Sequence, residues 1–247
     1  MKYIKIILIF IASLILYSCE SDSFYSSDSG SDQGTAGSLA RFAITGNYLY
    51  TVEYEQLKIF DISNEQKPIF IDQIYPGFDI ETIFPVENYL FLGSRWGVYI
   101  YDITNPESPK LLSQYTHIYS CDPVVVSGNY AYSTLNSSGP CGRGVNQLEV
   151  IDISNILNPT NVHTIVMDNP KGLGISNDFL FVCDNGIKVF DISNPDVPIF
   201  IRTENVDAFD VIPIDNLLIV VANSGLYQYE LNLNGELNLL STLYTKI

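Results

Sequence analysis

The sequence predicts an all-β protein, a five-bladed β-propeller with four antiparallel strands in each blade. Two observations predict this fold. A short apolar strand that ends in an acid recurs five times, and no segment has the sustained 3.6-residue period of an amphipathic helix. The repeated acids lie 41, 50, 39 and 39 residues apart, a spacing typical of propeller blades. These acids are Asp61, Asp102, Asp152, Asp191 and Glu230.

Each repeat within residues 39–247 has the same internal order. A first strand ends at a two-residue turn such as Gly46-Asn47, and a second strand such as Tyr48-Leu-Tyr50 follows at once. The acid-tipped strand is third, and a tight turn then leads into an outer fourth strand such as Pro106 to Leu112. Because the repeats begin with a first strand and end with a fourth, we expect ring closure to depend on packing between blades 5 and 1.

The repeated acids allow two interpretations, a metal site or a structural role. Four of the five precede Ser or Thr at a strand end, where a carboxylate accepts backbone hydrogen bonds and closes a turn. One acid per blade, spread around a ring, cannot converge on one ion. We therefore expect a structural role, no metal site and no cofactor. The sequence also has no nucleophile elbow, phosphate-binding glycine loop or zinc-protease motif.

Residues 1–18 have the composition of a secretory signal peptide. Two lysines precede an apolar run from Ile6 to Leu16, which is too short to cross a bilayer. Cys19 follows directly, in a context that resembles the lipobox of bacterial lipoproteins. The resemblance implies that Cys19 becomes the lipidated first residue of a protein anchored in the bacterial cell envelope, at the outer membrane. Ordinary cleavage, with Cys19 as an incidental thiol, is the alternative.

Residues 19–38 are rich in Ser, Asp and Gly, so we expect a flexible tether there.

The net charge of the chain limits the classes of partner that we expect. The chain has 12 basic and 28 acidic residues, a formal charge of −16. Such a surface repels phosphates and anionic lipid headgroups. We expect membrane attachment through the lipid anchor, no nucleic-acid partner, and a protein or glycan partner in the envelope.

Three stretches of the repeats resemble the LVIVD-repeat family of β-propellers, which are common in bacterial envelopes. They are Cys121-Asp-Pro-Val-Val-Val126, Gln147-Leu-Glu-Val-Ile-Asp-Ile153 and Asp210-Val-Ile-Pro213. The resemblance covers essentially all of residues 39–247. Because this family is defined by its fold, the resemblance implies an architecture and no particular activity.

The irregular loops of a propeller gather on one face, because strands alternate in direction. The first-to-second and third-to-fourth turns are short and alike in every blade, whereas the second-to-third loops and the crossovers vary. Function on β scaffolds concentrates in variable loops, so we expect the binding surface on this loop-rich face. Its candidate contact residues are Arg95, Trp96 and Arg143, since Trp and Arg dominate interface energetics.

The first strands start on this same face, at the axis, with about one charge per blade. The residues at this channel mouth are Arg41, Glu81, Asp122, Lys171 and Asp210. Three carboxylates around one axis allow a glycosidase-like hydrolase, which is the alternative function. We expect instead that the two cations pair with these carboxylates and lower their pKa values. The preferred hypothesis is a non-catalytic binding module, and a spacer without a dedicated site is a third possibility.

The cysteines of the repeats fall into two groups. Cys121 and Cys141 lie on the same face of blade 3, and disulfides persist in the envelope, so we expect them to pair. Cys183 lies in an apolar strand and is expected to be a small core residue.

Overall fold

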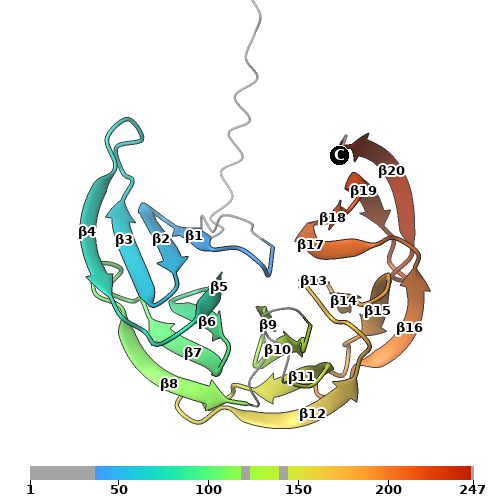
Figure 1. The fold of residues 1–247 in the computed structure, drawn as a ribbon, viewed down its shortest axis with the longest axis horizontal. Helices are drawn as coiled ribbons and strands as arrows, with labels where there is room; N and C mark the ends of the chain where they lie inside the picture. Colours follow the sequence, from blue (N-terminus) through green and yellow to red (C-terminus); the bar gives the residue numbers. More distant parts are fainter. Residues whose placement is uncertain (1–36, 118–122, 139–143, 246–247) are drawn as a thin grey trace, which may run out of the picture. The chain divides into compact units, whose positions relative to one another are not determined.

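The structure of the chain is a computed structural model that describes residues 37–117, 123–138 and 144–245. These residues form five four-stranded antiparallel sheets and no helix, which confirms the all-β class and the five-bladed propeller. Within the described ranges there is consequently no helix long and apolar enough to span a bilayer. The sheets follow one another along the chain, one per repeat (Figure 1).

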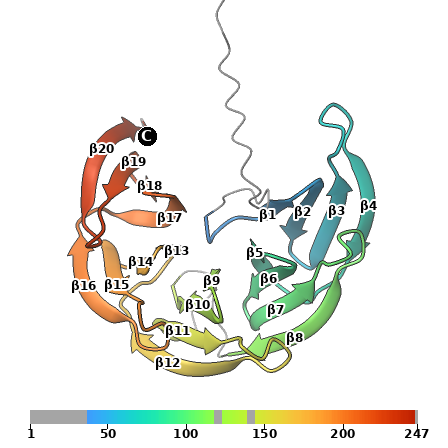
Figure 2. The ribbon, with the colours of Figure 1, turned by 180° about the vertical axis from the view of Figure 1, so that it is seen from behind.

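The strands of each blade run in order from the axis outward (Figures 1 and 2). The inner strands are β1 (Phe42–Thr45), β5 (Ile80–Val86), β9 (Val124–Ser127), β13 (Leu173–Ser176) and β17 (Ala208–Ile214). The second strands are β2 (Tyr48–Glu53), β6 (Tyr89–Ser94), β10 (Tyr130–Leu135), β14 (Phe179–Cys183) and β18 (Leu217–Ala222). The third strands are β3 (Gln56–Asp61), β7 (Gly97–Asp102), β11 (Gln147–Asp152), β15 (Ile187–Asp191) and β19 (Gly225–Leu231). The outer strands are β4 (Ile69–Ile74), β8 (Lys110–Thr116), β12 (Thr160–Val166), β16 (Ile199–Glu204) and β20 (Leu237–Tyr244).

The repeated acids close turns, as expected. In blades 1 to 4 one carboxylate oxygen accepts a hydrogen bond from the backbone N–H two residues later, at 2.7 or 2.8 Å. The hydrogen bonds from the following Ser or Thr lower the pKa of each carboxylate. Glu230 accepts no such bond within the described part of the chain. The four acids are Asp61, Asp102, Asp152 and Asp191.

The hydrophobic core is divided among four interfaces, each between consecutive blades. Tyr50 and Tyr101 belong to the cluster between blades 1 and 2, and three further clusters join blades 2 to 3, 3 to 4 and 4 to 5. In the described residues no cluster joins blade 5 to blade 1. Figures 1 and 2 show the same separation between the sheet of β1–β4 and the sheet of β17–β20. The expectation that blades 5 and 1 pack together is therefore wrong, and the five blades form an open arc.

Equivalent positions in different blades show what the missing interface leaves uncovered. A leucine stands near the start of the third strand in three blades. Leu57 and Leu148 are 0% exposed, because the next blade covers them, whereas Leu226 in blade 5 is 37% exposed. On the other side of the opening, Phe60 of blade 1 is only half-buried, whereas the equivalent Phe190 of blade 4 is 2% exposed. Both faces that border the opening are thus apolar and incompletely covered.

Candidate functional site

A cavity of about 500 Å³ lies on the loop-rich face, where loops of four blades meet near the axis. Its apolar wall comes from the approach to β1, from the approach to β9, from the crossover between blades 3 and 4, and from β17. The remaining wall carries amide, hydroxyl and ammonium groups. The lining residues are Leu39, Pro123, Asn136, Ser138, Asn169, Pro170, Lys171 and Phe209. A mostly apolar cavity of this size with a few polar groups is typical of a small-ligand site.

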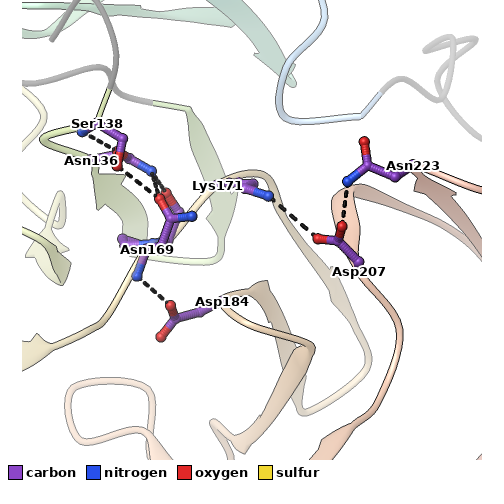
Figure 3. A network of polar contacts seen from close by, with 8 residues as sticks. Asn136, Ser138, Asn169, Lys171, Asp184, Asp207 and Asn223 are labelled. Atoms are coloured by element: carbon purple, nitrogen blue, oxygen red, sulfur yellow. Dashed lines mark hydrogen bonds and ion pairs between the residues drawn. The ribbon is translucent and has the colours of Figure 1, made fainter.

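Hydrogen bonds fix the amide groups on one side of this cavity (Figure 3). The Asn136 side-chain NH₂ donates to Asn169 Oδ1 at 3.0 Å and also to the Pro170 carbonyl. The Ser138 hydroxyl donates to the same Asn169 oxygen at 3.0 Å. Both acceptor positions of Asn169 Oδ1 are therefore used, and the Asn169 NH₂ group meets no acceptor among the described residues. Because Asn169 lines the cavity and is only half-buried, this NH₂ group could donate to water or to a ligand there.

Asp184 holds the crossover that carries Asn169. Its carboxylate accepts the backbone N–H groups of Asn169 at 2.6 Å and Asp168 at 3.1 Å, and the Lys188 ammonium at 2.6 Å. Burial alone would raise the pKa of Asp184, whose side chain is inaccessible, but these hydrogen bonds outweigh burial and lower it. The ionised carboxylate thus positions the crossover between blades 3 and 4 through its backbone N–H groups, and it is not available for chemistry in the cavity.

Lys171 supplies the cationic group of the cavity. Its Nζ lies 3.7 Å from Asp207 Oδ1 and 5.1 Å from the centroid of the Phe209 ring, a cation–π distance. Asp207 also accepts a hydrogen bond from the Asn223 side chain (Figure 3). The ammonium is therefore held over the aromatic wall of the cavity. Together with the Asn169 NH₂ group it offers donors to a ligand that has an apolar body and acceptor atoms.

The charges of the channel mouth pair differently from the expected pattern. Glu81 Oε1 accepts a hydrogen bond from Arg95 Nε at 3.0 Å, rather than from Arg41 or Lys171. The described residues give Arg41 no ion pair, and Lys171 pairs with Asp207 as described above. The reason is geometric, because the Arg95 N–H donates to the Asp79 carbonyl at 3.4 Å, which places the loop that carries Arg95 beside the start of β5. The candidate contact residue Arg95 is thus committed to carboxylates of its own blade.

Among the described residues, hydroxyl and backbone amide donors bind Asp210, and no cation does. Ser38 Oγ donates to Asp210 Oδ1 at 3.0 Å, and the backbone N–H of Leu39 donates to Oδ2 at 3.3 Å. Burial raises the pKa of Asp210 to about 6, and the hydrogen bond from Ser38 opposes this shift. The expectation of a lowered pKa is therefore wrong at this position. Ser38, which the sequence places at the end of the tether, is itself 1% exposed.

Some of the other candidate residues lie within the described ranges, and some lie outside them. Trp96 lies on the loop-rich face with 49% of its surface exposed. Cys183 is a buried free thiol, and burial raises its pKa, so it is a core residue as expected. In the described ranges no group of three or more His, Cys, Asp or Glu side chains could hold a metal ion. The candidates that lie outside the described residues are Cys19, Cys121, Asp122, Cys141 and Arg143.

The sequence did not single out Asn169, Asp184 or Phe209. Asn169 follows Asp168 and precedes Pro170 in a crossover that differs from those of the other blades, and this irregularity is the signal that could have found it. The hydrolase hypothesis loses two of its three groups, since Glu81 is paired with Arg95 and Asp210 is buried against Ser38. The described part of the axis therefore offers no open pair of carboxylates.

Comparison with protein families identifies the repeat. The LVIVD repeat model matches residues 36–74, 83–117, 120–139, 141–165 and 170–206, which is more than half of the chain. The chain belongs to the LVIVD-repeat family. No curated protein matches this LVIVD-repeat propeller.

Several solved structures resemble this LVIVD-repeat propeller in fold. A protein from Lactobacillus plantarum is 16% identical with a TM-score of 0.65, over 79% of this chain and 67% of that one. A functionally unknown protein from Desulfotomaculum acetoxidans is 12% identical with a TM-score of 0.64, over 87% and 70%. The periplasmic gluconolactonase PpgL of Pseudomonas aeruginosa is 16% identical with a TM-score of 0.63, over 81% and 68%. At these identities the similarity establishes the fold alone.

Proposed function

We propose that this LVIVD-repeat protein is a lipid-anchored binding protein of the bacterial cell envelope, and that its loop-rich face takes up a ligand or a partner's side chain at the axial cavity. One observation carries the proposal: the Asn169 NH₂ group is held in place at the cavity and has no acceptor among the described residues. Asn169 is half-buried and its NH₂ group is not one of the buried polar atoms that lack a partner, so a ligand's acceptor atom would replace water at a donor that is already ordered.

The lining favours a ligand with an apolar face and one or two acceptor groups, such as the C–H face of a saccharide with its hydroxyl oxygens or an apolar peptide segment with its carbonyls. Phe209 and Leu39 provide apolar contact, and Lys171 adds a second donor. The hydrolase alternative lacks support, because neither Glu81 nor Asp210 is open to a substrate. Resemblance in fold to a gluconolactonase adds nothing to that alternative at 16% identity.

Ligand-induced stabilisation tests the proposal. The purified protein is screened against oligosaccharides and short neutral peptides while thermal unfolding is followed. A ligand present at a hundred times its Kd stabilises the native state by about 2.7 kcal/mol. We expect Asn169→Ala and Lys171→Gln each to abolish this stabilisation.

A matched control uses another cavity, of about 330 Å³, on the opposite face between blades 2 and 3. Asn129→Ala alters the lining of that cavity and should leave the stabilisation unchanged. Stabilisation that survives both Asn169→Ala and Lys171→Gln, but is lost in Asn129→Ala, would place binding on the wrong face for this proposal.

The location in the envelope rests on Cys19 and the residues before it. We expect Cys19→Ala to move the protein from the membrane fraction to the soluble periplasm, because the acidic body gains nothing from anionic headgroups. If this variant remains membrane-bound after a high-salt wash, the anchor lies elsewhere in the chain.

A further inference from the structure

Three neighbouring loops of blades 1 and 2 expose aromatic side chains that the axial cavity does not use. Tyr54 follows β2, Phe78 lies in the crossover between β4 and β5, and Trp96 lies between β6 and β7. Their exposed fractions are 71%, 65% and 49%. Grouped exposed apolar side chains mark interaction sites in soluble proteins. We refer to Tyr54, Phe78 and Trp96 together as the aromatic rim.

Backbone hydrogen bonds hold these three loops side by side. The Ile80 N–H donates to the Tyr54 carbonyl at 2.6 Å, as an isolated β-bridge. The Arg95 N–H donates to the Asp79 carbonyl at 3.4 Å. Each residue of the aromatic rim lies at one of these contacts or within two residues of it. The three loops that carry the aromatic rim are therefore direct neighbours along the chain's backbone hydrogen bonds.

The backbone conformation of Tyr54 is unfavourable for a tyrosine. Its φ is 54°, in the left-handed region that a bulky side chain adopts only with strain. The corresponding turn of blade 4 uses Asn185, with a φ of 51°, and Asn tolerates this region well. An exposed Tyr at such a position accepts strain and buries little surface in return. Strained residues of this kind cluster at functional sites.

Carboxylates surround the aromatic rim. Glu53 has a side chain that is 59% exposed, Asp79 one that is 41% exposed, and the exposed Glu55 directly follows Tyr54. Two nearby cations are paired with acids, Lys58 with Glu53 at 2.9 Å and Arg95 with Asp79 and Glu81. Arg41, whose carbonyl accepts the Val52 N–H at 2.8 Å, is a third nearby cation. The four acids Glu53, Glu55, Asp79 and Glu81 thus outnumber these three cations by one, beside exposed aromatic side chains on a chain of formal charge −16. Aromatic faces and carboxylates both attract cations.

We propose that the aromatic rim binds Lys and Arg side chains of a partner protein. The inference rests on the proposal that the loop-rich face is the binding face, but it uses residues outside the axial cavity. A neutral glycan would stack on the rings without using the surplus negative charge, and an anionic membrane surface would be repelled by it.

The aromatic rim carries its own reporter, because Trp96 is the one tryptophan of the chain. Hexa-arginine is titrated into the purified protein at moderate salt while tryptophan fluorescence is recorded, with chitohexaose as the neutral probe. We expect a saturable change with hexa-arginine and none with chitohexaose. Tyr54→Asn and Phe78→Ala should each weaken hexa-arginine binding at least tenfold, with an unchanged or higher Tm for Tyr54→Asn.

Tyr54→Asn and Phe78→Ala distinguish binding at the aromatic rim from non-specific attraction of hexa-arginine to the acidic protein, because neither replacement changes the net charge. Tyr244→Ala, at a 72%-exposed aromatic residue of blade 5, is the matched control and should bind like the wild type. Wild-type affinity in both rim variants would show general electrostatic attraction and overturn the proposal, as would binding of chitohexaose in place of hexa-arginine. Asn169→Ala should retain hexa-arginine binding, so a failure of the cavity proposal and a failure of the rim proposal give different results.

Discussion

The Ser38 hydroxyl donates a hydrogen bond to Asp210 Oδ1 at 3.0 Å, although the two residues are 172 positions apart in the chain. The same hydroxyl oxygen accepts the backbone N–H of Leu173 at 2.8 Å. The Asp210 carboxylate also fills the space that a Cβ atom would need at Gly37 and at Gly172. The segment that leads into blade 1 is thereby fixed against the inner strands of blades 4 and 5, without a packed interface between blades 5 and 1.

Removing this hydroxyl should destabilise the propeller. In Ser38→Ala, the Asp210 carboxylate loses a donor and the buried Leu173 N–H loses its acceptor, so we expect a loss of roughly 2 kcal/mol in the free energy of unfolding. Ser127→Ala, at an exposed strand end, is the control and should cost almost nothing. Urea unfolding measures both, and equal small effects would show that the contact contributes little.

Asp210 should give the stability a distinctive pH dependence. Its pKa is raised from 3.8 to about 6, so between these values the native state retains a proton that the unfolded chain has lost. The contribution of Asp210 to the free energy of unfolding is therefore present below pH 4 and lost as the pH rises through 6. Two units correspond to roughly 3 kcal/mol.

The variant Asp210→Asn isolates this contribution, because its side chain does not titrate. From pH 4 to pH 7 the wild type should lose roughly 3 kcal/mol relative to the variant. The turn-closing acids such as Asp102, whose pKa values are lowered, act in the opposite direction but are common to both proteins. Urea unfolding at four pH values measures the stability of both proteins. If the stability of the wild type relative to the variant stays constant or increases as the pH rises, the raised pKa is refuted.

The expected disulfide between Cys121 and Cys141 can be read from thiol labelling. Protein from an oxidising compartment, unfolded without reductant, should react with iodoacetamide at Cys183 alone among these three, and at all three after reduction. In the folded protein Cys183 should resist labelling, because it is buried and its pKa is raised. Peptide mapping by mass spectrometry identifies each site. Labelling of Cys121 and Cys141 before reduction would show that they are free thiols.

The parts of the fold that depend on local chemistry could be predicted from the sequence. The turn at Asp102 involves a hydrogen bond across two residues, so residue type and strand position were sufficient. The burial of Cys183 followed from the apolar strand around it. The order of strands in each blade followed from the repeat and its turns.

The parts that depend on contacts between distant loops could not be predicted. The pairing of Glu81 with Arg95 and of Lys171 with Asp207 depends on the conformations of the loops that carry these residues, which the repeat pattern does not specify. The burial of Ser38 against Asp210 joins the tether end to the fifth repeat, and no sequence period records that contact. Ring closure also failed as a prediction, because the angle between blades is set by side-chain packing at each interface and not by the number of strands.

The open arc is the central claim of this account, and a pair of leucines tests it most directly. Leu148 and Leu226 occupy the same position of the third strand in blades 3 and 5, with exposed fractions of 0% and 37%. Leu148→Ala should cost about 2–5 kcal/mol of unfolding free energy, as is usual for a fully buried leucine. Leu226→Ala should cost less than half of the value measured for Leu148→Ala, because no following blade covers it. Equal losses for the two variants, measured by urea unfolding, would show that blade 5 packs on blade 1 and that the ring is closed.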